Sequence, residues 1–429
     1  MKPYPAYKDS GIEWIGEVPE HWEISKAKYH SKIVLGKMLT PNDKGNYQLK
    51  SYLKAKNILW EKVDVSEVEE MWFSENEMNQ YRLQLKDLVV SEGGEVGRTA
   101  IWMNELEECY IQNSVHKVTV NMPHNPRYFL FQFVSHGKRG YFDSIVSRVS
   151  IAHLTREKLK EVTVFVPSPE EQQSISIFLD HKTSQIDNLI DKKQKQIELL
   201  KEERTSIINQ AVTKGLNPDV PMKDSGIEWL GEVPEHWEIR KLKYLADQTR
   251  EKKETYGSLK IGLENIESWT GRLINLELEN VFESEGIAFN QGAILFGKLR
   301  PYLAKVHKAQ EAGICVSEIL VLRPNKIVTS DFLYYRCLSD DFIKEVNSST
   351  YGSKMPRANW DFIGNLSIPF PTISEQNSIT SLIVSSIHKS NRLIESIQQQ
   401  ITILQEYRTA LISNAVTGKI DVRREEGMQ

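Results

Sequence analysis

Basic and aromatic side chains gather after a short apolar run in the second half of the chain. Lys298, Arg300 and Tyr302 follow the residues ILFG, a pattern typical of a buried β-strand that ends in an exposed turn. Lysine and arginine neutralise phosphates, and arginine can bridge O6 and N7 of guanine. The loop therefore indicates contact with DNA, although each basic residue alone is a weak signal.

The first half carries a glycine-rich turn at the corresponding place. Gly93, Gly94 and Arg98 follow the apolar run LVV, and glycine allows the backbone to come close to a phosphate. A second pair of basic loops lies further along each half. The candidate DNA-binding residues are therefore Gly93, Gly94, Arg98, Arg148, His153, Lys298, Arg300, Tyr302, Lys354 and Arg357.

Sequence signals for catalysis are missing or weak. A methyltransferase needs a glycine motif for its cofactor and a catalytic loop of the Asp/Asn-Pro-Pro-Tyr type, and neither is found; the sequence has no P-loop motif either. Asp219 followed by Glu251–Lys253 loosely resembles a metal-dependent nuclease pattern, but the first half has no equivalent. We therefore predict no catalytic residue and no metal on this chain.

Composition limits the class of protein. The chain has 429 residues, of which 40% are hydrophobic and 26% charged, and its net charge is −4. This balance predicts two or three globular domains without a membrane-spanning segment, and any surface for DNA must be basic only locally. The three cysteines, Cys109, Cys315 and Cys337, are widely spaced and odd in number, which argues against a disulfide framework or a zinc cage and predicts a cytoplasmic location.

An internal repeat sets the organisation of the chain. Lys8–Tyr29 and Lys223–Tyr244 differ at only three positions, and Pro167–Ile175 resembles Pro371–Ile379. The residues between these two anchors diverge. The chain therefore consists of a block and a long segment followed by a second block and a second long segment, with a shared frame and a variable middle.

The long segments are predicted to be helices. Ser168 with Glu171, and Thr372 with Glu375, form capping-box patterns, and no proline or glycine interrupts either segment from the first helical turn until its end. A heptad pattern predicts that the two helices pair. The seam residues are Ile190, Ile197, Leu200 and Ile207 in the first helix and Ile394, Ile401, Leu404 and Leu411 in the second.

Connectivity predicts that the two helices run antiparallel. The first block leads into one helix, the short linker after Gly215 begins the second block, and the second helix leaves that block. We therefore expect an α+β fold with two pseudo-symmetric globular domains separated by a long antiparallel two-helix coiled coil. The expected domains are 1–167 and 216–370, and the expected helices, with the C-terminal tail, are 168–215 and 371–429. Two related readers suit a bipartite site on duplex DNA, whose strands are also related by a dyad.

With these features, the chain resembles the specificity subunit of type I restriction–modification systems. The resemblance lies in the motif KDSGIEWLGEVPEHWE, in the helix starts EEQ and SEQ, and in the duplicated layout, and it covers essentially the whole chain. It implies two target-recognition domains, each reading half of an asymmetric DNA site. Ser91–Arg98 and Gly297–Tyr302 resemble recognition segments of the family.

The resemblance also implies partners. Two methylating modification subunits and, for cleavage, restriction subunits are expected to assemble with the chain. S-adenosylmethionine, ATP and magnesium are expected on those partners only. Two alternatives stay open at the level of sequence: a coiled-coil scaffold that binds proteins without DNA specificity, and a metal-dependent nuclease.

Overall fold

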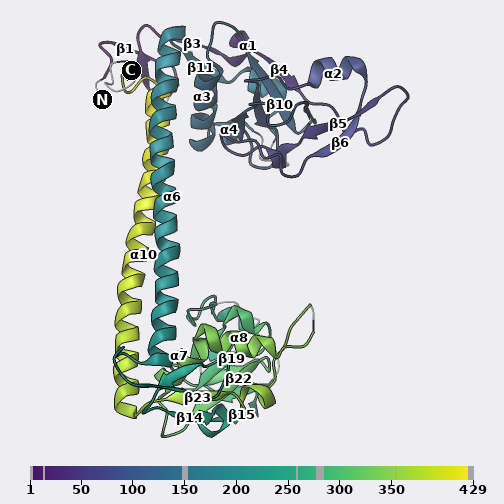
Figure 1. Cartoon of the computed structure of the whole chain (residues 1–429). Coiled ribbons are helices and arrows are strands. Elements are labelled where there is room, and N and C mark those ends of the chain that lie inside the picture. Colours follow the sequence, from purple (N-terminus) through teal and green to yellow (C-terminus); the bar gives the residue numbers. More distant parts are fainter. Residues whose placement is uncertain are drawn as a thin grey trace. The chain divides into compact units, whose positions relative to one another are not determined.

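The computed structural model describes residues 3–12, 15–146, 153–257, 259–276, 285–352 and 354–423. The chain divides into two compact units, one formed by Met1–Lys192 with Gln399–Gln429 and the other by Lys193–Gln398. Each unit combines strands and short helices with half of each of two long helices (Figure 1). The mixed helix and strand class predicted from the sequence is therefore confirmed.

The first unit is built on two small sheets. An antiparallel sheet has the strand order β4-β10-β7-β8, and a second sheet, in which β5 and β9 are parallel, has the order β6-β5-β9. The bounds are β4 Ser31–Leu35, β5 Gln48–Leu53, β6 Glu69–Phe73, β7 Leu88–Ser91, β8 Thr99–Ile101, β9 Tyr110–Ile111 and β10 Val115–Val120.

Two further strand pairs and several short helices complete this unit. The hairpin β1-β2 and the pair β3-β11 lie in the repeated frame, and the apolar helix α3 packs against β8. The bounds are β1 Tyr7–Asp9, β2 Glu17–Pro19, β3 Glu23–Lys26, β11 Thr163–Val166, α1 Ala27–His30, η1 Ala55–Asn57, α2 Glu75–Tyr81, α3 Pro126–Lys138, α4 Tyr141–Ile145 and α5 Arg156–Lys160.

The second unit repeats this plan. Its antiparallel sheet has the order β15-β22-β19-β20, and β12-β13 and β14-β23 repeat the frame. The other sheet, β16-β18-β21-β17, keeps one parallel pair but differs in its remaining strands, in agreement with the divergent middle of the sequence. The bounds are β12 Met222–Asp224, β13 Glu232–Pro234, β14 Glu238–Lys241, β15 Ala246–Thr249, β16 Lys252–Lys253, β17 Leu259–Ile261, β18 Gly286–Phe289, β19 Ile294–Gly297, β20 Val306–Lys308, β21 Gly313–Cys315, β22 Ile319–Pro324 and β23 Ser367–Phe370.

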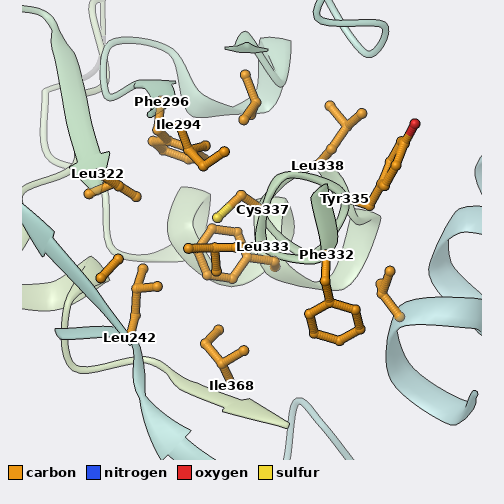
Figure 2. Close-up of a cluster of buried hydrophobic side chains, with 14 of the residues drawn as sticks. Leu242, Ile294, Phe296, Leu322, Phe332, Leu333, Tyr335, Cys337, Leu338 and Ile368 are labelled. Atoms are coloured by element: carbon orange, nitrogen blue, oxygen red, sulfur yellow. The ribbon is translucent and has the colours of Figure 1, made fainter. Parts of the chain in front are cut away.

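The main core of the second unit forms around one helix. Figure 2 shows Phe332, Leu333 and Cys337 of α7 among the sheet residues Phe296 and Leu322. All five are buried, so the helix and the end of β19 are held by close packing. The helices of this unit are η2 Leu242–Tyr244, η3 Leu263–Asn265, η4 Pro301–Leu303, α7 Ser330–Leu338, α8 Asp340–Ser348 and α9 Trp360–Ile363.

The two long helices are α6, Pro169–Lys214, and α10, Ile373–Val416. In the first unit the N-terminal half of α6 lies beside the C-terminal half of α10, where Arg408 bonds to Asp187. In the second unit the C-terminal half of α6 shares a core with the N-terminal half of α10, through Ile208 and Ile383. The antiparallel pairing predicted from connectivity is thus confirmed.

The residues expected at the seam differ in burial. Ile207 is half-buried, and its neighbour Ile208 is buried instead because Ile208 joins the core of the second unit. Among the other expected seam residues, Ile190, Ile197, Ile401 and Leu411 are buried and Leu200, Ile394 and Leu404 are half-buried. In the described part of the chain, no helix has the length and apolar character needed to cross a membrane.

Candidate nucleic-acid interface

Hydrogen bonds link the repeated sequence motif in the globular part of each unit to the start of a long helix. The buried indole Nε1 of Trp22 donates a 3.2 Å hydrogen bond to Oε1 of Glu171, and Nε2 of His21 lies 3.0 Å from Oε2 of the same carboxylate. The motif therefore has a structural role; Trp14 of the same motif lies outside the described residues. The second unit repeats the arrangement with His236, Trp237 and Glu375.

The glutamate of the predicted capping box is used differently from the prediction. Ser168 Oγ does accept a hydrogen bond of 3.3 Å from the backbone N–H of Glu171. The Glu171 carboxylate, however, bonds to His21 and Trp22. Ser168 therefore caps the start of the helix as a capping box requires, but the Glu171 carboxylate binds His21 and Trp22 in place of the backbone at the helix start.

In the second unit, two loops that are distant in sequence meet at the end of β19. The backbone N–H of Lys298 donates to the carbonyl oxygen of Glu318 at 3.0 Å, and the N–H of Ala358 donates to the carbonyl oxygen of Lys298 at 2.9 Å. The N–H of Arg300 also donates to the carbonyl oxygen of Pro356 at 2.7 Å. These bonds bring the predicted basic loops at residues 298–302 and 354–357 together.

The side chains on these loops are basic, aromatic and accessible. The side chains of Lys298, Arg300 and Lys354 make no hydrogen bond or ion pair with another residue that the structure describes, so their charges are available to a ligand. Arg357 is different, because its Nη2 donates to Oε1 of Glu318 at 2.9 Å. Tyr302 is 46% exposed and provides a π-face beside the cations.

Two members of this surface were missed from the sequence. Tyr351 and Met355 lie in the same loop as Lys354, and each is 60% exposed. Their position beside a candidate lysine was the only available signal, since exposure cannot be read from a single apolar residue. We call Lys298, Arg300, Tyr302, Tyr351, Lys354, Met355 and Arg357 the basic surface of the second unit.

Equivalent backbone bonds form in the first unit. The N–H of Glu92 donates to the carbonyl oxygen of Ser114 at 2.9 Å, and the N–H of Leu154 donates to the carbonyl oxygen of Glu92 at 2.8 Å. The predicted glycine turn and the exposed His153 are therefore adjacent, while Arg148 lies outside the described residues. Gly94 has a φ of +75° and an open space where a Cβ would point, so this turn is accessible.

Arg98 holds the turn onto a neighbouring helix. Its Nη2 donates a 2.8 Å hydrogen bond to the carbonyl oxygen of Ala55, the first residue of η1, and the side chain is half-buried. In the second unit Lys305 donates to the carbonyl oxygen of Leu263, the first residue of η3, at 2.6 Å. In both units a basic side chain thus binds a backbone carbonyl of the neighbouring helix. Because its guanidinium is engaged in this way, Arg98 is not included in the proposed contact surface.

Two regions of the chain, residues 19–199 and 234–403, match the family model of the type I restriction modification DNA specificity domain. The chain belongs to this family. It is 26% identical over 306 residues to the specificity subunit of the type I restriction enzyme MjaVIII of Methanocaldococcus jannaschii, covering 67% of this chain and 68% of the relative. The putative MjaX specificity subunit of the same organism is 23% identical over 444 residues, covering 95% and 96% of the two chains.

Solved structures share the fold. A chain from a study of complex assembly and conformational transition of the type I restriction–modification system has a TM-score of 0.71 at 12% identity, covering 94% of this chain and 99% of that one. The HsdS subunit of Thermoanaerobacter tengcongensis has a TM-score of 0.53 at 13% identity, covering 94% and 98%.

Family membership confirms the prediction of a DNA specificity subunit. Both matched regions are DNA specificity domains, so the family assignment is to a recognition module and not to a catalytic one. Specificity subunits of type I systems bind DNA and assemble with methylase and restriction subunits.

Proposed function

We propose that this chain reads a bipartite, asymmetric site on duplex DNA and directs methylation and restriction of that DNA by partner subunits. The observation that carries the proposal is the presence of two DNA specificity domains with the same frame and different side chains on their loops. A shared frame presents both loops in the same way, while different loop residues select different bases. The two half-sites are therefore unlike.

The basic surface of the second unit is proposed to contact one half-site. Lys298, Arg300 and Lys354 are cations without a described partner, and Arg300 has a positive φ of 51° while a backbone hydrogen bond holds its amide. Because the backbone is already held, binding of the guanidinium costs no further backbone entropy at this residue. In the first unit, the other half-site is proposed to be contacted by the turn at Gly93 and Gly94, by His153 and by Arg148.

The proposal includes the partners expected from the sequence. Two modification subunits bind S-adenosylmethionine and methylate the DNA, and restriction subunits use ATP and magnesium to cleave it. All act in the cytoplasm. The proposed readers are residues 1–167 and 216–370, and the proposed spacers are the helices within 168–215 and 371–429.

The proposal is tested by the affinity for DNA of a complex reconstituted from this chain and its modification subunit. Replacing Lys298, Arg300 and Lys354 by alanine should weaken binding by at least tenfold and flatten the dependence of affinity on salt, because fewer counterions are released. Lys344→Ala is the matched control, since this exposed lysine of the same unit is paired with Asp340. Unchanged affinity of the triple variant would contradict the proposed surface, and a protein scaffold would not bind duplex DNA at all.

A further inference from the structure

One structurally equivalent backbone position carries opposite charge in the two units. The residue that follows β7 or β19 is Glu92 in the first unit and Lys298 in the second. Its N–H donates to the carbonyl oxygen of Ser114 or Glu318, and its carbonyl oxygen accepts from Leu154 or Ala358. The same two backbone hydrogen bonds therefore hold Glu92 and Lys298. His153 and Arg357, which directly precede Leu154 and Ala358 in the sequence, also occupy equivalent positions.

The side chains of Glu92 and Lys298 form no hydrogen bond or ion pair with a residue that the structure describes. Glu92 is half-buried. Burial raises the pKa of Glu92, while the nearby His153 opposes this rise. The carboxylate is thus partly desolvated without a compensating donor, which is unfavourable for the free protein.

The polarity of each side chain limits what it can contact on DNA. A carboxylate repels phosphates, and on the major-groove edges of bases it can only accept from the amino groups N4 of cytosine and N6 of adenine. An ammonium group can only donate, and O6 and N7 of guanine are the strongest acceptors there. Gly93 and the open turn at Gly94 follow Glu92 and leave room for DNA beside the carboxylate.

We propose that Glu92 and Lys298 are equivalent specificity-determining residues of opposite polarity, Glu92 accepting from a base amino group in one half-site and Lys298 donating to a base acceptor in the other. This inference rests on the proposed function, because it assumes that both loops face DNA. It goes further in assigning the hydrogen-bond polarity of one base in each half-site. The inverted charge at one shared backbone position is the observation that carries it.

The test measures base preference in both half-sites. The complex with the modification subunit selects duplexes from a library in which the half-sites are randomised, and the selected DNA is sequenced. Glu92→Lys should change the preference at one position from an amino-bearing base to an acceptor-bearing base by about 5- to 150-fold, the range for one good base contact. The other half-site should be unchanged. Lys298→Glu should produce the reverse change in the other half-site only.

Controls separate this inference from the proposed function. Glu107→Lys makes the same charge change at an exposed residue of the first unit and should leave both base preferences unchanged. Glu92→Gln keeps the size of the side chain, and should weaken the preference at the same position if Glu92→Lys does not fold. Uniformly altered affinity without a change in base preference would overturn the inference and leave the proposed function standing. A native complex without preference in either half-site would overturn both.

Discussion

Nε1 of Trp22 donates a hydrogen bond of 3.2 Å to Oε1 of Glu171, which connects the first repeated motif to the first turn of α6. Both side chains are buried. The second unit contains the same bond between Trp237 and Glu375 at 3.1 Å, but there the glutamate side chain is 27% exposed. The same connection therefore lies in a drier environment in the first unit.

This difference predicts a graded loss of stability. Glu171→Ala should lower the unfolding free energy of the first unit by about 1–3 kcal/mol, because the indole N–H of Trp22 is left buried without an acceptor. Glu375→Ala should cost less, since water can reach the freed group. Hydrogen-exchange protection within each unit measures both effects. Glu170→Ala, on the exposed side of the same turn, is the control, and equal losses for all three variants would contradict the assignment.

Arg408 and Arg204 occupy equivalent positions on the two long helices but have different surroundings. Arg408 bonds to Asp187 of α6 and to Glu61, and its side chain is 20% exposed. Arg204 is half-buried and forms no ion pair or hydrogen bond with a described residue, and Asn391 stands where the first unit has Asp187. Among the described residues, the ion-pair network is thus found in the first unit and not in the second.

We expect Arg408→Ala to destabilise the first unit by about 2–4 kcal/mol, because it leaves two carboxylates without their cation in a partly dry site. Arg204→Ala should change the stability of the second unit by about 1 kcal/mol or less. Local unfolding free energies from hydrogen exchange of α6 and α10 provide the comparison. A larger effect at Arg204 than at Arg408 would show that the hydrogen bonds of Arg408 are not the source of its stabilisation.

The first unit should lose stability in mild acid. Burial lowers the pKa of His116 to about 4, from an ordinary value near 6.5. Between these values the unfolded chain binds a proton that the folded chain does not, so stability falls as the pH falls, by up to about 1.4 kcal/mol per pH unit. His116→Leu introduces the residue type found at the equivalent position, Leu320, and should reduce this slope. Denaturation followed from pH 7 to 4 tests the prediction, and an unchanged slope would contradict it.

Glu92 should show the opposite dependence. Since burial raises its pKa in the folded state, the folded chain binds the proton more tightly than the unfolded chain, and stability is lost as the pH rises. Glu92→Gln should therefore be more stable than the native protein at neutral pH, and the difference should disappear in acid. Thermal unfolding at pH 4 and pH 7 measures both. A variant that is less stable at pH 7 would mean that the carboxylate has a stabilising partner.

Much of the fold could be predicted from the sequence because its signals are local. The long helices follow from capping residues and a seam of spaced apolar residues, and the strand ends at Ser91 and Gly297 follow from short apolar runs. The antiparallel direction follows from connectivity alone. By contrast, the use of Glu171 by Trp22 depends on residues far apart in the chain, and no local pattern encodes it.

The candidate surface was predictable only in part. Lys298 and Arg357 were both candidates, but their closeness depends on bonds through Glu318 and Ala358, which have no sequence signature. Arg98 shows the reverse case, since a basic residue in a glycine turn reads as a ligand contact although its guanidinium bonds to Ala55. Residue type indicates chemistry, but tertiary contacts decide whether that chemistry is available.

Each unit is proposed to read its own half of a split DNA sequence. The most direct test is methylation mapping of DNA from cells that produce this chain with its modification subunit, beside the same cells producing Arg300→Ala. We expect one motif made of two unlike half-sites separated by unspecified base pairs, and relaxed specificity in only one half-site for the variant. A contiguous motif, no common motif, or equal relaxation of both half-sites would contradict it.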